Sequence, residues 1–158
     1  ASGTARNNVC RHNGLRGIDV TSSAAPTLEG NVCEQNEDCG IYYWRKGSGT
    51  ARKNLCRDNR QHGIGVAGLA APTLEQNRCE KNSLYGIFYP EKASGTACEN
   101  VVRSNEAGDI SVEDSARPKL ERNYDPKIAR ARVGVILGAI FGVIVGTIVE
   151  ASSGESWR

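Results

Sequence analysis

Residues 25–47 read APTLEGNVCEQNEDCGIYYWRKG, and this stretch recurs along the chain with a period of 23 residues. The most regular positions of the period are two asparagines. They form the series Asn8, Asn31, Asn54, Asn77, Asn100 and Asn123, and the series Asn13, Asn36, Asn59, Asn82 and Asn105. A fixed period of about 20–50 residues, held without insertions, is typical of stacked-repeat proteins. The repeat therefore predicts the fold class.

Each repeat contains three short apolar segments with turn residues between them. In residues 25–47 the segments centre on Leu28, on Val32–Cys33 and on 41–43. Each segment is too short for an ordinary helix and lacks the 3.6-residue helical period. Three such strands with corners between them make one coil of a parallel β-helix. Coils stack about 4.8 Å apart, so equivalent side chains from successive coils should lie above one another.

Two further series keep the 23-residue interval and are expected to point inward. They are Ile18, Ile41, Ile64, Ile87 and Ile110, and Cys10, Cys33, Cys56 and Cys79, with Val102 in the fifth place. We expect these cysteines to pack as buried thiols, and copper(I) binding by stacked thiolates is the alternative. Cys39 and Cys98 lie off this series and are expected to be exposed. The asparagines should occupy left-handed corners and form amide ladders.

Charged residues alternate in sign from one coil to the next. One column reads Arg11, Glu34, Arg57, Glu80 and Arg103, and another begins Arg6, Glu29, Arg52 and Glu75. Stacked like charges would repel, so we interpret the alternation as control of strand register. Duplication of a 46-residue ancestor explains the alternation equally well.

The Asn-x-Cys-x-x-Asn…Gly-Ile pattern resembles the right-handed parallel β-helix repeats of the pectin-lyase-like superfamily. The resemblance covers roughly residues 2–125 and implies an all-β fold, a right-handed parallel β-helix of about five 23-residue coils in residues 1–125. Relatives implied by this resemblance include polysaccharide lyases and hydrolases, periplasmic copper-processing proteins, repeat regions of bacterial kinases and an F-box adaptor. The pattern therefore specifies a fold and leaves the activity open.

A catalytic cluster is not apparent in these residues. The resemblance implies that a lyase would use clustered acids that bind calcium, with an Arg or Lys base. Of the acids outside the charge columns, Asp109, Glu113 and Asp114 lie near the last coil and Asp19 lies four coils earlier. We do not expect them to converge on a cleft. His12 and His62 occupy different coil positions, and both are expected to be solvated. We therefore predict no catalytic residue, no metal site, no cofactor and no enzymatic activity.

Aromatic residues give the more informative surface. Strand alternation predicts that Tyr42, Trp44 and Phe88 face outward, and Tyr85 at the turn of the fourth coil should join them. Aromatic side chains exposed in a row are typical of contact surfaces. We expect a protein partner there, with stacking of sugars as the second possibility and scattered aromatics without a role as the third.

Residues 133–149 read VGVILGAIFGVIVGTIV and contain no charge. A helix of this length spans about 26 Å, close to the thickness of a bilayer's hydrocarbon core. We predict a transmembrane helix at 133–151, with a buried core helix as the alternative. The glycines spaced four apart predict packing against another membrane helix, either a second copy or a subunit of a larger complex. They are Gly134, Gly138, Gly142 and Gly146.

Basic residues precede this apolar segment. Lys127, Arg130 and Arg132 lie in the predicted juxtamembrane linker 126–132 and are expected to contact anionic lipid. Positive flanks favour the cytoplasmic side, which predicts a single-pass protein with its β-helix in the cytoplasm and a short polar tail at 152–158. A net charge of +2 does not suggest a nucleic-acid partner.

These patterns together predict a membrane-anchored, non-enzymatic scaffold or accessory subunit. It would bind a neighbouring membrane helix through the glycines and a soluble protein through the aromatic surface. The alternatives are a carbohydrate-binding or carbohydrate-active β-helix, and the repeat sensor region of a longer signalling protein. The chain contains no methionine, so we expect it to be a processed product or a fragment.

Overall fold

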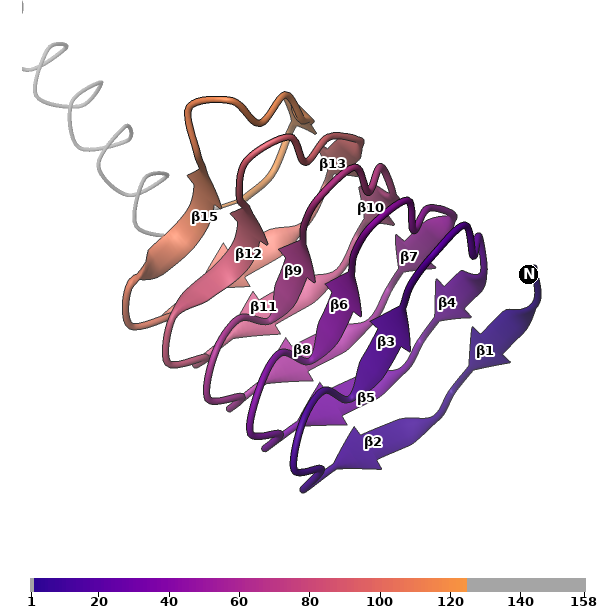
Figure 1. Ribbon diagram of the computed structural model, residues 1–158. Coiled ribbons are helices and arrows are strands. Elements are labelled where there is room, and N and C mark those ends of the chain that lie inside the picture. Colours follow the sequence, from indigo (N-terminus) through magenta and orange to yellow (C-terminus); the bar gives the residue numbers. More distant parts are fainter. Residues whose placement is uncertain (1, 125–158) are drawn as a thin grey trace, which may run out of the picture. The chain divides into compact units, whose positions relative to one another are not determined.

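The computed structural model describes residues 2–124, which form a parallel β-helix of sixteen short strands in three sheets (Figure 1). Sheet A contains β1 (Thr4–Arg6), β4 (Thr27–Glu29), β7 (Thr50–Arg52), β10 (Thr73–Glu75), β13 (Thr96–Cys98) and β16 (Lys119–Glu121). Sheet B contains β2 (Val9–Arg11), β5 (Val32–Glu34), β8 (Leu55–Arg57), β11 (Arg78–Glu80) and β14 (Val101–Arg103). Sheet C contains β3 (Ile18–Val20), β6 (Ile41–Tyr43), β9 (Ile64–Val66), β12 (Tyr85–Tyr89) and β15 (Gly108–Val112).

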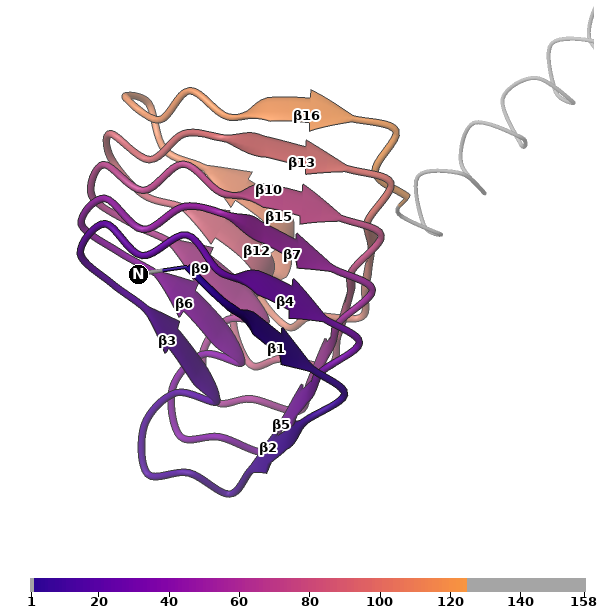
Figure 2. The same cartoon turned by 90° about the vertical axis from the view of Figure 1, so that its right-hand side faces the viewer.

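Neighbouring strands of each sheet are parallel, and their register equals the sequence period. Cys10 pairs with Cys33 in sheet B, and Ile18 pairs with Ile41 in sheet C. Figure 2 shows the coils lying one above another, with one strand of each coil in each sheet. The predicted all-β parallel β-helix of about five coils is confirmed.

The core lies between the three sheets and alternates large and small layers along the rod. The second coil contributes Leu28 and Tyr43, whereas the third contributes Ala51 and Val66 at the same two positions, and all four are almost completely buried. The fourth coil repeats the large pair. A tyrosine ring in one coil therefore has space beside the small residues of the next, which allows close packing without voids.

The asparagine ladders hold successive coils together. Asn31 donates from its backbone N and from Nδ2 to Oδ1 of Asn54, at 2.9 and 3.0 Å. Asn54 Nδ2 also donates to the carbonyl of Leu28 at 3.0 Å. The predicted ladders are confirmed, but the ladder asparagines are not the left-handed residues. The residue before each of them is left-handed, as at Lys53 (φ 56°) and Asp58 (φ 54°), so asparagine is needed there for its amide group.

The alternating charges form ion pairs between coils, as predicted. Glu34 contacts Arg57 at 2.7 Å, and Glu80 contacts Arg103 at 2.8 Å and Arg78 of its own strand at 2.9 Å. Burial alone would raise the pKa of Glu80, but the two arginines outweigh it and the pKa lies below its ordinary value. The alternation therefore pairs opposite charges between coils at Arg6–Glu29, Glu29–Arg52, Glu34–Arg57 and Glu80–Arg103.

Cys33, Cys56 and Cys79 of the inward series lie in the core as free thiols, and Cys10 in the first coil is a half-buried free thiol. The hydrogen bond to Cys56, and then burial, raise the pKa of the Cys33 thiol. Cys98 is half-buried, whereas the expectation that Cys39 is exposed is wrong: Cys39 is only 1% exposed, and burial raises its pKa. Between residues 2 and 124, no group of three or more His, Cys, Asp or Glu side chains is arranged to hold a metal ion.

The predicted linker 126–132, transmembrane helix 133–151 and tail 152–158 lie outside the residues that the structure describes. The same holds for the glycine series of that helix and for the three basic residues before it. The part of the chain that is described, 2–124, contains no helix with the length and hydrophobicity needed to cross a membrane.

Candidate functional site

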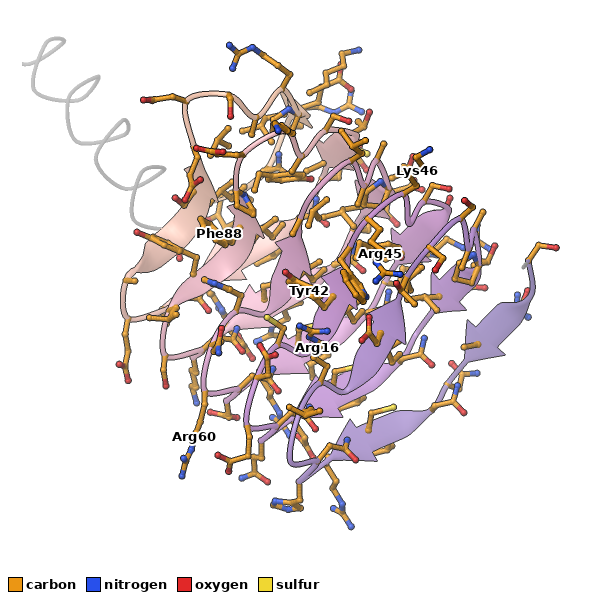
Figure 3. The ribbon with its side chains drawn as sticks, viewed as in Figure 1. Arg16, Tyr42, Arg45, Lys46, Arg60 and Phe88 are labelled. Atoms are coloured by element: carbon orange, nitrogen blue, oxygen red, sulfur yellow. The ribbon has the colours of Figure 1, made fainter. Side chains whose placement is uncertain are left out.

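The outer side of sheet C gathers the candidate functional side chains of the described residues. One column of equivalent positions runs through residues 19, 42, 65, 88 and 111, and a second column lies three residues earlier, at 16, 39, 62, 85 and 108. These two columns contain Arg16, Asp19, Tyr42, His62, Tyr85 and Phe88, and Asp38 lies beside them. We call these seven residues the sheet C strip. Figure 3 shows Arg16, Tyr42 and Phe88 following one another along the outer side of this sheet.

Three rings from two adjacent coils form a stacked cluster in the strip. The His62 ring lies on Phe88 with centroids 4.5 Å apart, and Phe88 lies 5.5 Å from Tyr85. The His62 and Tyr85 rings are nearly parallel, at 8° and 5.7 Å. Tyr85 and Phe88 are half-buried. The cluster is a rigid apolar surface, because each ring restricts the rotamers of the others.

His62 is an internal part of this cluster, so the expectation of a solvated side chain is wrong for it. Its side chain is only 7% exposed, and its Nδ1 accepts a hydrogen bond from the backbone N–H of Tyr85 at 3.2 Å. Burial lowers the pKa of His62, with Asp38 acting in the opposite direction. The ring is therefore neutral at pH 7 and carries its proton on Nε2.

Arg16 extends the row of rings toward the first coil. Its guanidinium carbon lies 3.9 Å from the centroid of the Tyr42 ring, a cation–π contact. Arg16 also donates from Nη1 to Asp19 at 2.9 Å and from Nε to Asp38 at 3.1 Å. Burial would lower the pKa of Arg16, but the two carboxylates outweigh it and raise the pKa. Two partners and an aromatic face therefore hold the guanidinium plane in one orientation.

Gly65 determines where the Tyr42 ring lies. It occupies the outward column between Tyr42 and Phe88, and a Cβ atom built at Gly65 would lie 2.6 Å from Cδ2 of Tyr42. The ring of Tyr42 therefore lies across strand β9 in space that only glycine leaves open. Glycine at this position lets an aromatic residue of the second coil reach toward the cluster of the third and fourth coils.

Trp44 is separate from the strip. It follows the end of β6 and is half-buried, with its Nε1 atom buried and without a hydrogen-bond partner among the residues that the structure describes. The guanidinium of Arg45 covers its ring at 4.3 Å. Of the four aromatic residues predicted as a contact surface, Tyr85 and Phe88 stack on each other and Tyr42 shares their face, while Trp44 lies at the next corner.

Two acidic residues of the last coil do share a pocket, contrary to our expectation that the isolated acids do not converge. Glu113 and Asp114 line it together with Glu91 and Ser115. A carboxylate oxygen of Glu113 accepts a hydrogen bond from the backbone N–H of Glu91 at 3.1 Å. All four residues are exposed. The residues that line the pocket include no nucleophile beyond the hydroxyl of Ser115.

Arg16, Asp19, Asp38 and His62 are members of the strip that the sequence-based surface prediction omitted. A signal for two of them was present, since Arg16, His62 and Tyr85 occupy the same position of the 23-residue period. Tracing that column would have placed an arginine, a histidine and a tyrosine on one line. Asp38 has no such signal, because its role depends on where the Arg16 side chain turns.

Comparison with known proteins agrees with this architecture. Residues 1–124 match the family model described as the right-handed β-helix region, and the chain belongs to this family. No curated protein matches the chain.

Similar solved structures include the periplasmic alginate epimerase AlgG, with a TM-score of 0.68 and 19% identity over 78% of this chain and 35% of that one. A double mutant of the same enzyme matches with a TM-score of 0.71 and 21% identity over 77% of this chain and 33% of that one. This chain thus spans about a third of the epimerase. At this identity the likeness is one of fold.

The prediction that this chain is not an enzyme is corrected by that comparison. Its premise was that a β-helix without an obvious catalytic cluster is a scaffold, yet the similar solved structures include those of an epimerase. Histidine, arginine and aspartate side chains that appeared scattered in the sequence are also neighbours on sheet C. Distance along the sequence was therefore a poor guide to which groups are close in space.

Proposed function

We propose that the protein is a carbohydrate-binding or carbohydrate-active β-helix, and that the sheet C strip binds a saccharide chain. The single observation that carries this proposal is the row of Arg16, Tyr42, His62, Phe88 and Tyr85 on one face of the rod. Sites for small polar molecules combine apolar and aromatic surface with a few oriented polar groups. The strip has both features.

The chemistry of the strip matches the two kinds of surface on a sugar ring. Patches of C–H groups on a pyranose can contact the rings of Tyr42, Phe88 and Tyr85. Sugar hydroxyls can donate to the carboxylates of Asp19 and Asp38 and can accept from the phenol of Tyr42. Asp19 is the more accessible carboxylate, with 42% of its side chain exposed against 17% for Asp38.

The direction of the strip favours a polymer over a single sugar. Its side chains come from four successive coils, spaced about 4.8 Å apart along the rod. A chain of sugar units lying along the rod would contact Arg16 at one end and the rings of Tyr85 and Phe88 at the other. The similarity in fold to the alginate epimerase supports this class better than the scaffold role that we expected first.

Binding is tested with a panel of oligosaccharides of differing charge, by isothermal titration calorimetry. Tyr42→Ala and Phe88→Ala should each weaken binding about threefold to tenfold, because an aromatic contact contributes about 0.5–1.5 kcal/mol. Tyr124→Ala is the matched control, because Tyr124 is 51% exposed and does not belong to the strip. NMR spectra of the recovered saccharide distinguish binding from conversion. Failure of the whole panel to bind, or equal losses in the control, would exclude the proposal.

A further inference from the structure

The sheet C strip contains one permanent cation, and its charge is already compensated. Arg16 contacts Asp19 Oδ2 at 2.9 Å and Asp38 Oδ2 at 3.1 Å, and one face of its guanidinium lies on Tyr42. One positive charge is thus surrounded by two negative charges. An incoming carboxylate would have to replace an existing partner of Arg16 and would remain close to the other.

The remaining groups do not supply the missing positive charge. His62 is neutral at pH 7, because burial lowers its pKa. Two cations close to the strip residues in sequence have other contacts. Arg60 pairs with Glu37 at 2.7 Å, and the guanidinium of Arg45 lies on the ring of Trp44. Figure 3 shows Arg60 and Lys46 on opposite sides of the line formed by Arg16, Tyr42 and Phe88.

We propose that the strip selects saccharides without acidic groups and rejects polyuronates, and that Asp19 and Asp38 are the residues that determine this specificity. The inference rests on the proposed saccharide-binding function and names its substrate class. Neutral hydroxyls can donate hydrogen bonds to the two carboxylates, whereas a uronate carboxylate meets like charge at short range. Discrimination by charge repulsion differs from discrimination by shape, because removing the repelling charge should reverse it.

The test compares binding of three oligosaccharides of equal length, a neutral glucan, a chitosan fragment and an alginate fragment, by calorimetry. The wild-type protein should bind the alginate fragment at least tenfold more weakly than the neutral glucan. The double variant Asp19→Asn, Asp38→Asn should gain at least tenfold in affinity for the alginate fragment, because Arg16 is released from its carboxylates. An asparagine at position 38 keeps an oxygen that can accept from the Cys39 N–H, a bond of 2.8 Å in the present structure.

Two controls separate charge selection from changes in folding or in overall charge. Asp58→Asn removes the same charge at an exposed turn residue that follows sheet B, so it should not change the preference. Asp19→Asn alone changes an exposed side chain, so it should fold normally and give part of the gain. Alginate binding gained by the variants should weaken with added salt, whereas glucan binding should not.

Each outcome has a defined consequence. Preferential binding of the alginate fragment by the wild-type protein would overturn the specificity inference and leave the proposed function standing. A double variant that folds, binds the glucan and gains nothing for alginate would also overturn it. Absence of binding to all three saccharides by the wild-type protein would remove the proposed function, and the inference with it.

Discussion

Replacing a central rung of the asparagine ladder should be far more costly than replacing its first rung. In Asn54→Ala, Nδ2 no longer donates to Leu28 O and Asn77 Oδ1, and Oδ1 no longer accepts from Asn31 N and Asn31 Nδ2. Asn77 Oδ1 keeps the bond from the backbone N of residue 54. Two buried N–H groups of Asn31, the backbone N–H and one N–H of Nδ2, therefore lose their acceptor, and the Leu28 carbonyl loses the Asn54 donor.

Each buried group left unpaired costs about 1–3 kcal/mol, so the two together should lower the free energy of unfolding by about 2–6 kcal/mol. This is a large fraction of the stability of an ordinary domain. Asn8→Ala is the matched control, because Asn8 is exposed and its backbone N still bonds to Asn31 Oδ1. It removes one side-chain hydrogen bond, so the expected loss is about 0.5–1.5 kcal/mol.

Urea unfolding of both variants, followed by far-ultraviolet circular dichroism, measures the difference. Asn54→Ala should shift the midpoint to clearly lower urea, or prevent folding of the central coils. Asn54→Asp distinguishes a donor from an acceptor role, since the carboxylate keeps the acceptor that serves Asn31 and loses the donor to Leu28. If Asn54→Ala and Asn8→Ala were equally stable, the buried amide ladder would not be what holds the coils together.

Three other predictions follow from single positions. Gly65→Ala should displace the Tyr42 ring, since the new Cβ would lie 2.6 Å from it. Saccharide affinity measured by calorimetry should then fall about threefold or more. Unchanged affinity would contradict the proposed site. The lowered pKa of His62 means that its neutral ring stabilises the fold above about pH 6.5 and that this stability is lost as the pH falls through the lower folded-state pKa. Urea midpoints from pH 7 to 5 should therefore fall less in His62→Gln than in the wild type. Lys53→Gly should raise the free energy of unfolding by up to about 1 kcal/mol, because Lys53 has φ 56°, whereas Lys46→Gly at an ordinary backbone angle should not.

Much of the fold could be predicted because a β-helix assigns a fixed place in the coil to each position of the period. The 23-residue spacing of Cys10 and Cys33 is also the spacing of their strand pairing. The same argument predicts the inward isoleucines, the amide ladders and the ion pairs between coils. Each of these depends only on equivalent residues lying above one another, which the period alone requires.

The errors arose where a property depends on neighbours from other positions of the period. Cys39 is buried although it lies outside the inward series, because the ring of Tyr42 lies over the adjacent Gly65 and the sulfur lies 3.4 Å from the Cβ position of that glycine. His62 is buried by the rings of Tyr85 and Phe88. Periodicity carries no information about the rotamers that produce such contacts.

The sequence by itself determined the coil, its register and the identity of every residue in each column, because a strict period permits one alignment of coil on coil. The tertiary structure alone decided which columns meet across the outer face of sheet C. Arg16 reaches Asp38 and Tyr42, residues at other positions of the period, through the directions of long side chains. Those directions depend on the space that Gly65 and the neighbouring rings leave, and such space exists only once the coils have stacked.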